Sequence, residues 1–213
     1  QDGRILAVGP SAPATTEVLD PGAGTGWKKV EQAVPQSTGG VQNLTRLPSG
    51  DIACGWEGGC ASNGTSTTCV SFTNILGKNA DTVAAGPELT VGRSSFTAVR
   101  TVEGNVLFIG GAPAEDGRRV ELFDDPAATK TASDGSLSTA HITPTATVLP
   151  GGDILVTGGA QATLDRRVAP GLWTQSPFSL LHAREKHRAA RLHDGTVLVA
   201  GGENIIASAG GAT

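Results

Sequence analysis

The stretch Leu149-Pro-Gly-Gly-Asp-Ile-Leu-Val-Thr-Gly-Gly159 decides the fold. An Xaa-Gly pair supplies the positive φ that a tight hairpin turn needs. The run of β-branched and apolar residues that follows is typical of a strand buried on both faces. A closing Gly doublet favours a bend or a close approach of the backbone to a neighbour. The stretch therefore predicts a hairpin turn that leads into a buried strand.

The same pattern occurs five times along the chain. Its turn glycines lie 43 to 54 residues apart and are Gly3, Gly50, Gly104, Gly152 and Gly195. A repeat of this length indicates an array built from one supersecondary unit. A strand is expected before the later turns, over 95–102, 143–149 and 187–192. Arg93 and Arg184 occupy the same place in their copies, with His141 and Gly39 at the equivalent positions.

Two further strands are expected in each repeat. One ends in Asp-Pro, at 20–21 and 125–126, and the next is marked by Trp27 or Trp173. The segment Ser133-Asp-Gly-Ser136 is interpreted as a turn. Four strands per repeat predict that each copy is one blade of a β-propeller.

These features resemble the kelch-repeat family of β-propellers, through the Gly doublets, the Asp-Pro pairs and the two tryptophans. The stretch 149–159 is similar to the divergent kelch copies of secreted bacterial proteins. We therefore expect an all-β fold, a kelch-type β-propeller of four-stranded blades that spans 1–213 as a single domain. About four and a half blades are present, so the ring is incomplete in this chain. Missing polypeptide or a second chain is expected to complete it, because open sheet edges would otherwise remain.

Composition narrows the range of partners. The formal net charge is −4 and the pI is near 5.5, which argues against nucleic acid, since phosphate backbones require clustered Lys and Arg. No apolar run is long enough to span a membrane. The chain contains no Met, so Gln1 is expected to be a cut end. The resemblance implies an extracellular or cell-surface location in bacteria.

Three cysteines lie close together in the second copy. A disulfide between Cys60 and Cys69 would close the loop between them and leave Cys54 as a buried thiol in a strand, which suits an oxidising compartment. The alternative is three reduced cysteines. Zinc is not expected, because the sequence has no CxxC pair and no nearby His.

No catalytic residues, cofactor or metal site are predicted. The kelch family includes a copper-radical oxidase, but that chemistry needs Tyr and this chain has none. Three histidines, His182, His187 and His193, could suggest a metal site, but a structural role is favoured.

The predicted binding surface is the rim where loops enter and leave the blades, because loops on a rigid scaffold carry function. The loops over 9–15, 55–68, 110–119 and 158–166 are assigned to it. The candidate ligand-binding residues are Arg93, Arg184, Glu57, Glu115, Asp116, Asp165 and Arg166. Kelch domains that bind acidic peptides use arginines near the first two positions. The alternative is that Arg93 and Arg184 only tie one blade to the next.

Three functions follow from these observations. The first is a non-catalytic binding or assembly module that holds a protein or carbohydrate partner. The second is the scaffold of a larger extracellular carbohydrate-active enzyme, whose catalytic residues lie outside this chain. The third is a subunit of a filament or envelope complex in which open edges pair between chains.

Overall fold

The computed structural model of the chain describes residues 5–8, 14–34, 41–62, 67–77, 82–113, 117–125 and 128–204. Within these residues the chain forms antiparallel strands and no helix, so the all-β prediction is confirmed. The chain divides into two compact units, Gln1–Gly92 with Asp125–Lys130 and Arg93–Asp124 with Thr131–Thr213. The expectation of one domain stays a prediction, and each unit is described by itself.

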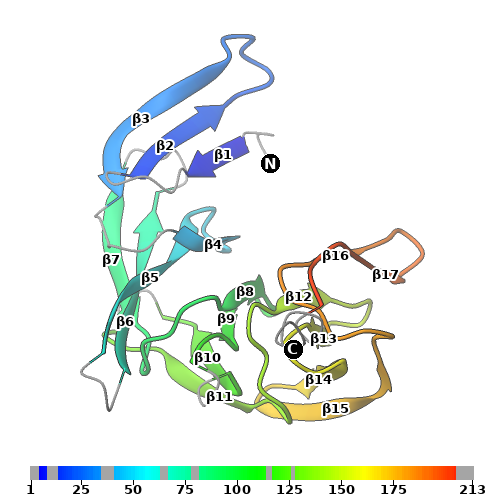
Figure 1. Cartoon of the computed structure of the whole chain (residues 1–213). Coiled ribbons are helices and arrows are strands. Elements are labelled where there is room, and N and C mark those ends of the chain that lie inside the picture. The colour runs from blue at the N-terminus through cyan, green and yellow to red at the C-terminus, as the bar shows by residue number, and fades with distance from the viewer. Residues whose placement is uncertain are drawn as a thin grey trace, which may run out of the picture. The chain divides into compact units, whose positions relative to one another are not determined.

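The first unit contains two sheets (Figure 1). A three-stranded sheet consists of β1 (Ile5–Val8), β2 (Ala14–Leu19) and β3 (Trp27–Val34). A four-stranded sheet follows in chain order, with β4 (Val41–Arg46), β5 (Ile52–Ser62), β6 (Thr67–Leu76) and β7 (Val83–Glu88). Every neighbouring pair is antiparallel.

One expected loop of the first unit is mostly strand. The segment 55–68 was assigned to the rim, but β5 and β6 extend through most of it as a long hairpin, and 63–66 lie outside the described residues. The physical reason is that β6 is rich in Thr, with Thr67, Thr68 and Thr73, and Thr has high strand propensity. The register places Cys60 directly opposite Cys69.

The second unit contains two four-stranded sheets and a two-stranded hairpin. The first sheet comprises β8 (Thr97–Arg100), β9 (Val106–Ile109), β10 (Arg119–Phe123) and β11 (Ala132–Ser136). The second comprises β12 (Thr145–Val148), β13 (Ile154–Thr157), β14 (Thr163–Ala169) and β15 (Leu172–Ser179). The hairpin pairs β16 (Arg188–Arg191) with β17 (Val197–Ala200).

The repeat turns form as expected. Gly50, Gly104, Gly152 and Gly195 have φ values of 93°, 101°, 98° and 89°, and Gly3 lies outside the described residues. A left-handed non-glycine residue also recurs in three copies, a feature that the sequence pattern did not indicate. These residues are Ser95, Thr143 and Lys186, each two positions after the aligned Arg93, His141 or Arg184. The repeats therefore agree in backbone conformation as well as in sequence.

The interpretation of 133–136 as a turn is wrong. These residues belong to β11, and their backbone lies against the turn between β14 and β15. A Cβ at Gly135 would lie 2.4 Å from the carbonyl oxygen of Gly171. Glycine is needed here for two reasons, because its φ is +84° and because two backbones meet closely.

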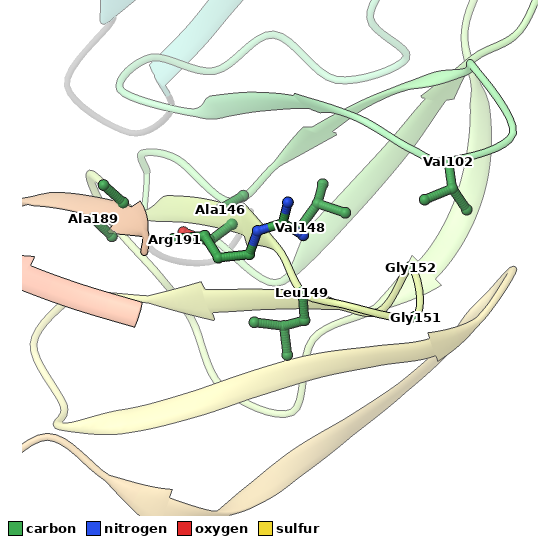
Figure 2. Close-up of a pocket in the computed structure, with 10 residues that line it drawn as sticks. Val102, Ala146, Val148, Leu149, Gly151, Gly152, Ala189 and Arg191 are labelled. Carbon is green, nitrogen blue, oxygen red and sulfur yellow. The ribbon is translucent and has the colours of Figure 1, made fainter. Parts of the chain in front are cut away.

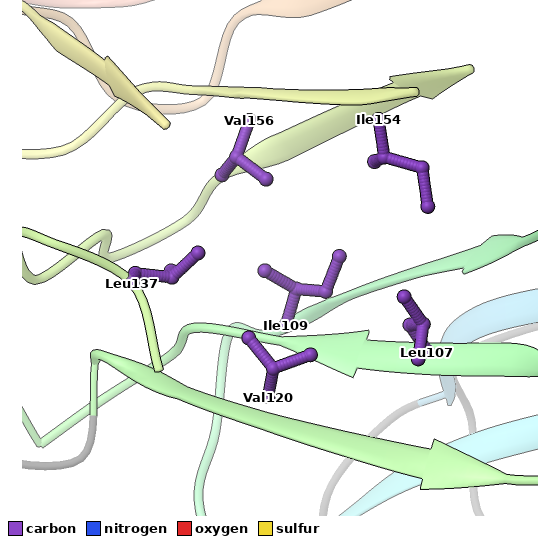
Figure 3. Packing of buried hydrophobic residues seen from close by; sticks show 6 residues of the cluster. All are labelled: Leu107, Ile109, Val120, Leu137, Ile154 and Val156. Carbon is purple, nitrogen blue, oxygen red and sulfur yellow. The ribbon is translucent and has the colours of Figure 1, made fainter. Parts of the chain in front are cut away.

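A buried apolar cluster joins the two sheets of the second unit (Figure 3). Ile154 and Val156 on β13 lie against side chains from the β8–β11 sheet and the segment that follows it. Those side chains are Leu107, Ile109, Val120 and Leu137, and every member of the cluster is at most 1% exposed. The two sheets therefore pack face to face over a dry core.

The repeated apolar strand differs in burial among its copies. All four residues of β9 are buried and β13 is nearly so, whereas β17 alternates between half-buried and exposed residues. Because β9 and β13 each pair with strands on both sides and β17 pairs only with β16 among the described residues, the last copy lacks the neighbours that cover the others.

Candidate functional site

A pocket lies in the second unit where β12 and β16 approach their hairpin turns (Figure 2). Its volume is about 810 Å³, which falls within the range of small-ligand and peptide sites. Its walls come from β12, β16 and the turns at Val102 and Gly152. The lining residues are Val102, Ala146, Thr147, Val148, Leu149, Gly151, Gly152, Ala189, Ala190 and Arg191.

The lining is apolar in its side chains and polar through its backbone. Thr147 and Arg191 carry the polar side chains of the lining, and Thr147 is only 8% exposed. Gly151 and Gly152 contribute main chain alone, and β12 is an edge strand of its sheet. An occupant therefore meets aliphatic surface, main-chain hydrogen-bonding groups and one guanidinium group.

Arg191 is the one charged residue of this lining. In Figure 2 its side chain extends across the pocket toward Val148. It is exposed, and no hydrogen bond or ion pair joins its guanidinium group to another residue in the described part of the chain. A guanidinium group in this setting favours a carboxylate, because it can donate two parallel hydrogen bonds.

The acidic residues that neighbour the pocket-lining residues along the chain already have hydrogen-bond or ion-pair partners. Asp153 pairs with Arg166, whose Nε donates to Asp153 Oδ2 at 2.6 Å. Asp194 accepts hydrogen bonds from the amide and the hydroxyl of Thr196, at 2.9 and 2.7 Å. The nearby Thr101 hydroxyl, the Glu103 amide and Arg167, which lies 3.9 Å away, hold the pKa of Glu103 below its usual value. The guanidinium group of Arg191 is therefore available to bind an anion from outside the chain.

The two arginines that were predicted to bind a ligand at the rim, Arg93 and Arg184, form hydrogen bonds to other groups of the protein. Arg93 is 0% exposed, its Nη1 lies 2.9 Å from Glu121 Oε1 and its Nη2 donates to the carbonyl of Phe108 at 3.0 Å. Half-buried Arg184 donates to the carbonyl of Gly201 at 2.9 Å. These partners lie in each arginine's own sheet or hairpin, so these contacts are made within one repeat.

His141 makes the equivalent contact in the copy between them. Its Nδ1 hydrogen bonds to the carbonyl of Gly158, the first residue of the Gly doublet. The aligned position thus carries one role in three copies: it fastens the loop that enters the inner strand to the backbone near the doublet. The sequence showed the equivalence of the positions but not this role.

Asp165 fastens another part of the rim. It is 0% exposed on β14 and accepts hydrogen bonds from the amide of Ser138 at 2.8 Å and from His141 Nε2 at 2.9 Å. Burial raises the pKa of Asp165, but the hydrogen bonds from His141 and Ser138 outweigh it, so the pKa lies below its ordinary value. The carboxylate holds the segment between β11 and β12 in place.

Among the other predicted contacts, the structure describes the side chain of Arg166. Arg166 lies on β14 opposite Leu155 and is half exposed, so it belongs to a strand and the expected loop 158–166 is shorter than predicted. Glu115 and Asp116 lie outside the described residues, and so does the side chain of Glu57.

The cysteines and histidines are placed as follows. Cys54 on β5 is buried and free, as expected, and burial raises its pKa to about 12. The Cα partners Cys60 and Cys69 have the spacing that a cross-strand disulfide requires, but their side chains are not described and the bridge stays a prediction. His187 is buried, whereas His182 and His193 are exposed. The described residues contain no group of three or more His, Cys, Asp or Glu side chains that could hold a metal ion.

An ion pair between the two sheets of the second unit was missed. Arg167 on β14 donates from Nε and Nη2 to the two carboxylate oxygens of Asp134 on β11, at 2.7 and 3.0 Å. The Trp173 indole donates to the carbonyl of Asp134 at 2.8 Å, and the amide of Gly171 donates to its carboxylate at 3.1 Å. The Asp-Gly pair and the tryptophan were visible in the sequence, but their contact joins different repeats.

Comparison with known proteins identifies the fold alone. No protein-family model and no curated protein matches the chain. A solved protein of unknown function from Dyadobacter fermentans is 15% identical, with a TM-score of 0.60 over 90% of this chain and 65% of the other. A fungal alcohol oxidase of the AA5 family, solved in complex with copper, is 17% identical, with a TM-score of 0.63 over 95% of this chain and 47% of the other. The chain thus spans about half to two thirds of the length of these structures.

None of the described residues lies in a helix long and apolar enough to cross a membrane.

Proposed function

We propose that this chain is part of a kelch-type β-propeller that works as a non-catalytic binding module outside a bacterial cell. The binding site is the pocket between β12 and β16, and its occupant is an extended peptide that carries an acidic side chain two residues from an apolar one, so that both lie on the same face. The observation that supports this proposal is Arg191, which has no partner among the described residues and lies in a pocket lined otherwise by aliphatic side chains, main chain and the nearly buried Thr147.

The lining favours a protein segment over a carbohydrate. Sugars are held by aromatic faces and by several polar side chains, and this lining has no aromatic ring among its described residues. An extended peptide instead places alternate side chains on one face and can use its main chain against an edge strand. An acidic side chain two residues from an apolar one can therefore pair with Arg191 while its neighbour occupies the aliphatic wall.

Binding of a labelled peptide in which leucine and glutamate take turns at every second position, with serine between them, tests this proposal by fluorescence anisotropy. The Arg191→Gln variant is expected to bind about 10-fold more weakly or worse, because a charge-assisted hydrogen bond contributes about 1.5–3 kcal/mol. Arg188→Gln is the matched control, since Arg188 lies on the same strand outside the lining. Ala189→Phe is expected to fill the pocket and abolish binding.

Two results would overturn the proposal. One is that the leucine–glutamate peptide binds no better than a leucine–lysine peptide of the same length. The other is that Arg188→Gln and Arg191→Gln weaken binding equally, since the effect would then be one of net charge.

A second function rests on one comparison. The fold is similar to about half of a copper-containing alcohol oxidase, so this chain could be the scaffold of a larger extracellular enzyme. Because the chain contains no Tyr, the redox chemistry would have to come from other polypeptide. Alcohol-dependent oxygen consumption by the longest natural form of the polypeptide, loaded with copper, would support this function over the first.

A further inference from the structure

A buried histidine joins the last hairpin of the second unit to the sheet before it. His187 immediately precedes β16 and is 1% exposed. Its Nε2 lies 2.9 Å from Thr145 Oγ1 at the start of β12 and 2.7 Å from Thr157 Oγ1 at the end of β13. The two hydroxyls are themselves 2.8 Å apart. One ring nitrogen thus links two neighbouring repeats.

The second ring nitrogen has no such partner. His187 Nδ1 is enclosed and makes no hydrogen bond within the described part of the chain. The ring lies against Gly158, where a Cβ would be 2.4 Å from Cε1. A neutral imidazole tolerates this setting, because Nδ1 can be the nitrogen without a proton. An imidazolium would carry a buried N–H with no acceptor, which is an unfavourable arrangement.

The surrounding charges add to this penalty. Burial, followed by the positive charges of Arg184 and Arg188, holds the pKa of His187 below its ordinary value of 6.5. On the other side of Gly158 lies the hydrogen-bonded pair His141 and Asp165. The remaining titratable groups around the joint are Glu185, Lys186 and Glu203, of which the last two form an ion pair with each other.

We propose that His187 is a pH-sensitive joint, whose neutral ring holds β16 against β12 and β13 and whose protonation releases the β16–β17 hairpin. The released histidine is hydrated and binds a proton more tightly than the enclosed one. Acidification below 6.5 therefore shifts the equilibrium toward the released form, by about tenfold per pH unit until the pKa of the enclosed ring is reached.

The joint has a consequence for the pocket. Residues 189–191 follow His187 directly and form one wall of it. Release of the hairpin would open that wall and discharge a bound peptide in acid. This consequence rests on the proposed function, whereas the joint itself does not.

Hydrogen exchange followed by mass spectrometry at pH 7.5, 6.5 and 5.5, corrected for the intrinsic exchange rate, tests the joint. Protection of β16 and β17 is expected to fall about fivefold between pH 6.5 and 5.5, because a released ring is already half protonated at pH 6.5, while β9 keeps its protection. His187→Phe should remove this dependence, and Phe96 at the aligned position shows that the repeat accepts that ring. His193→Gln, at an exposed histidine, is the matched control and should behave as the natural chain.

A titration of the His187 ring by NMR decides the matter if the Phe variant does not fold. A pKa of 6.5 or above, or pH-dependent exchange that persists in a folded His187→Phe protein, would overturn the joint. Loss of peptide binding with an intact pH response in exchange would instead overturn the proposed function and leave the joint standing.

Discussion

The ion pair between Arg167 and Asp134 provides the sharpest test of how the two sheets of the second unit are held together. Their side chains are 7% and 5% exposed, and the Asp134 carboxylate accepts two hydrogen bonds from Arg167 and one from the amide of Gly171. Arg167→Met keeps the aliphatic bulk and removes two of these three bonds. A buried carboxylate is then left with one donor.

The expected loss of stability follows from those contacts. Each charge-assisted hydrogen bond contributes about 1.5–3 kcal/mol, and removal of one partner of a buried pair typically costs about 3–5 kcal/mol. We therefore expect Arg167→Met to lower the free energy of unfolding by about 3–5 kcal/mol. Asp134→Leu in the same chain should recover part of this loss, because no uncompensated charge remains, with a coupling of about 1–3 kcal/mol.

Urea unfolding followed by the fluorescence of Trp173 measures the effect, because its indole donates to the backbone of Asp134. Trp27→Phe and Trp56→Phe in every variant make Trp173 the only reporter. Arg166→Met is the control, since Arg166 is adjacent, half exposed and paired with a surface carboxylate. Equal losses for Arg166→Met and Arg167→Met, or additive single and double changes, would refute the reasoning.

Three further outcomes are expected. Gly158→Ala should destabilise the protein by several kcal/mol, because its φ is +102° and its Cβ would meet His187. Gly151→Ala, at φ +96° in open space, should cost only about 1–2 kcal/mol of backbone strain. Equal losses of unfolding free energy in denaturant melts would contradict this. Cys54, with its pKa near 12, should resist a thiol reagent at pH 8 until the chain unfolds; labelling of the native protein at the rate of a free thiol would show that it is not enclosed. The pKa of Asp165 is lower in the folded chain than its ordinary value of 3.8, so the stability that it contributes is present above about pH 4 and is lost as pH falls through the folded pKa. Asp165→Asn should therefore be less stable at pH 6 but show a shallower loss between pH 4 and 2, and an unchanged slope would argue against the assignment.

The repeat pattern predicted the strands well, because each unit is local. A turn glycine and the apolar run after it lie within ten residues of each other, so their geometry depends on neighbouring backbone alone. This is why Gly104 and Gly152 turn as expected and why β9 and β13 form as strands. The same local reasoning failed at 133–136, where Gly135 lies in a strand and packs against the backbone of another repeat.

The candidate site could not be predicted in the same way. Charge and loop position selected Arg93 and Asp165, but both side chains are buried and hydrogen bonded, since only the packed fold shows which polar groups already have partners. Arg191 was not among the predicted binding residues, because nothing in the sequence distinguishes it from Arg188 on the same strand. Its importance comes from its place beside β12, in a different repeat.

The amino-acid sequence by itself determined the all-β character of the protein, its repeat and the positions of its hairpin turns, because these depend on residues that are neighbours along the chain. Only the tertiary structure decided which polar side chains already have hydrogen-bond partners, where a pocket opens and which histidine is enclosed. Those properties depend on contacts between residues tens of positions apart, and a repeat pattern does not specify which side chains of adjacent copies meet.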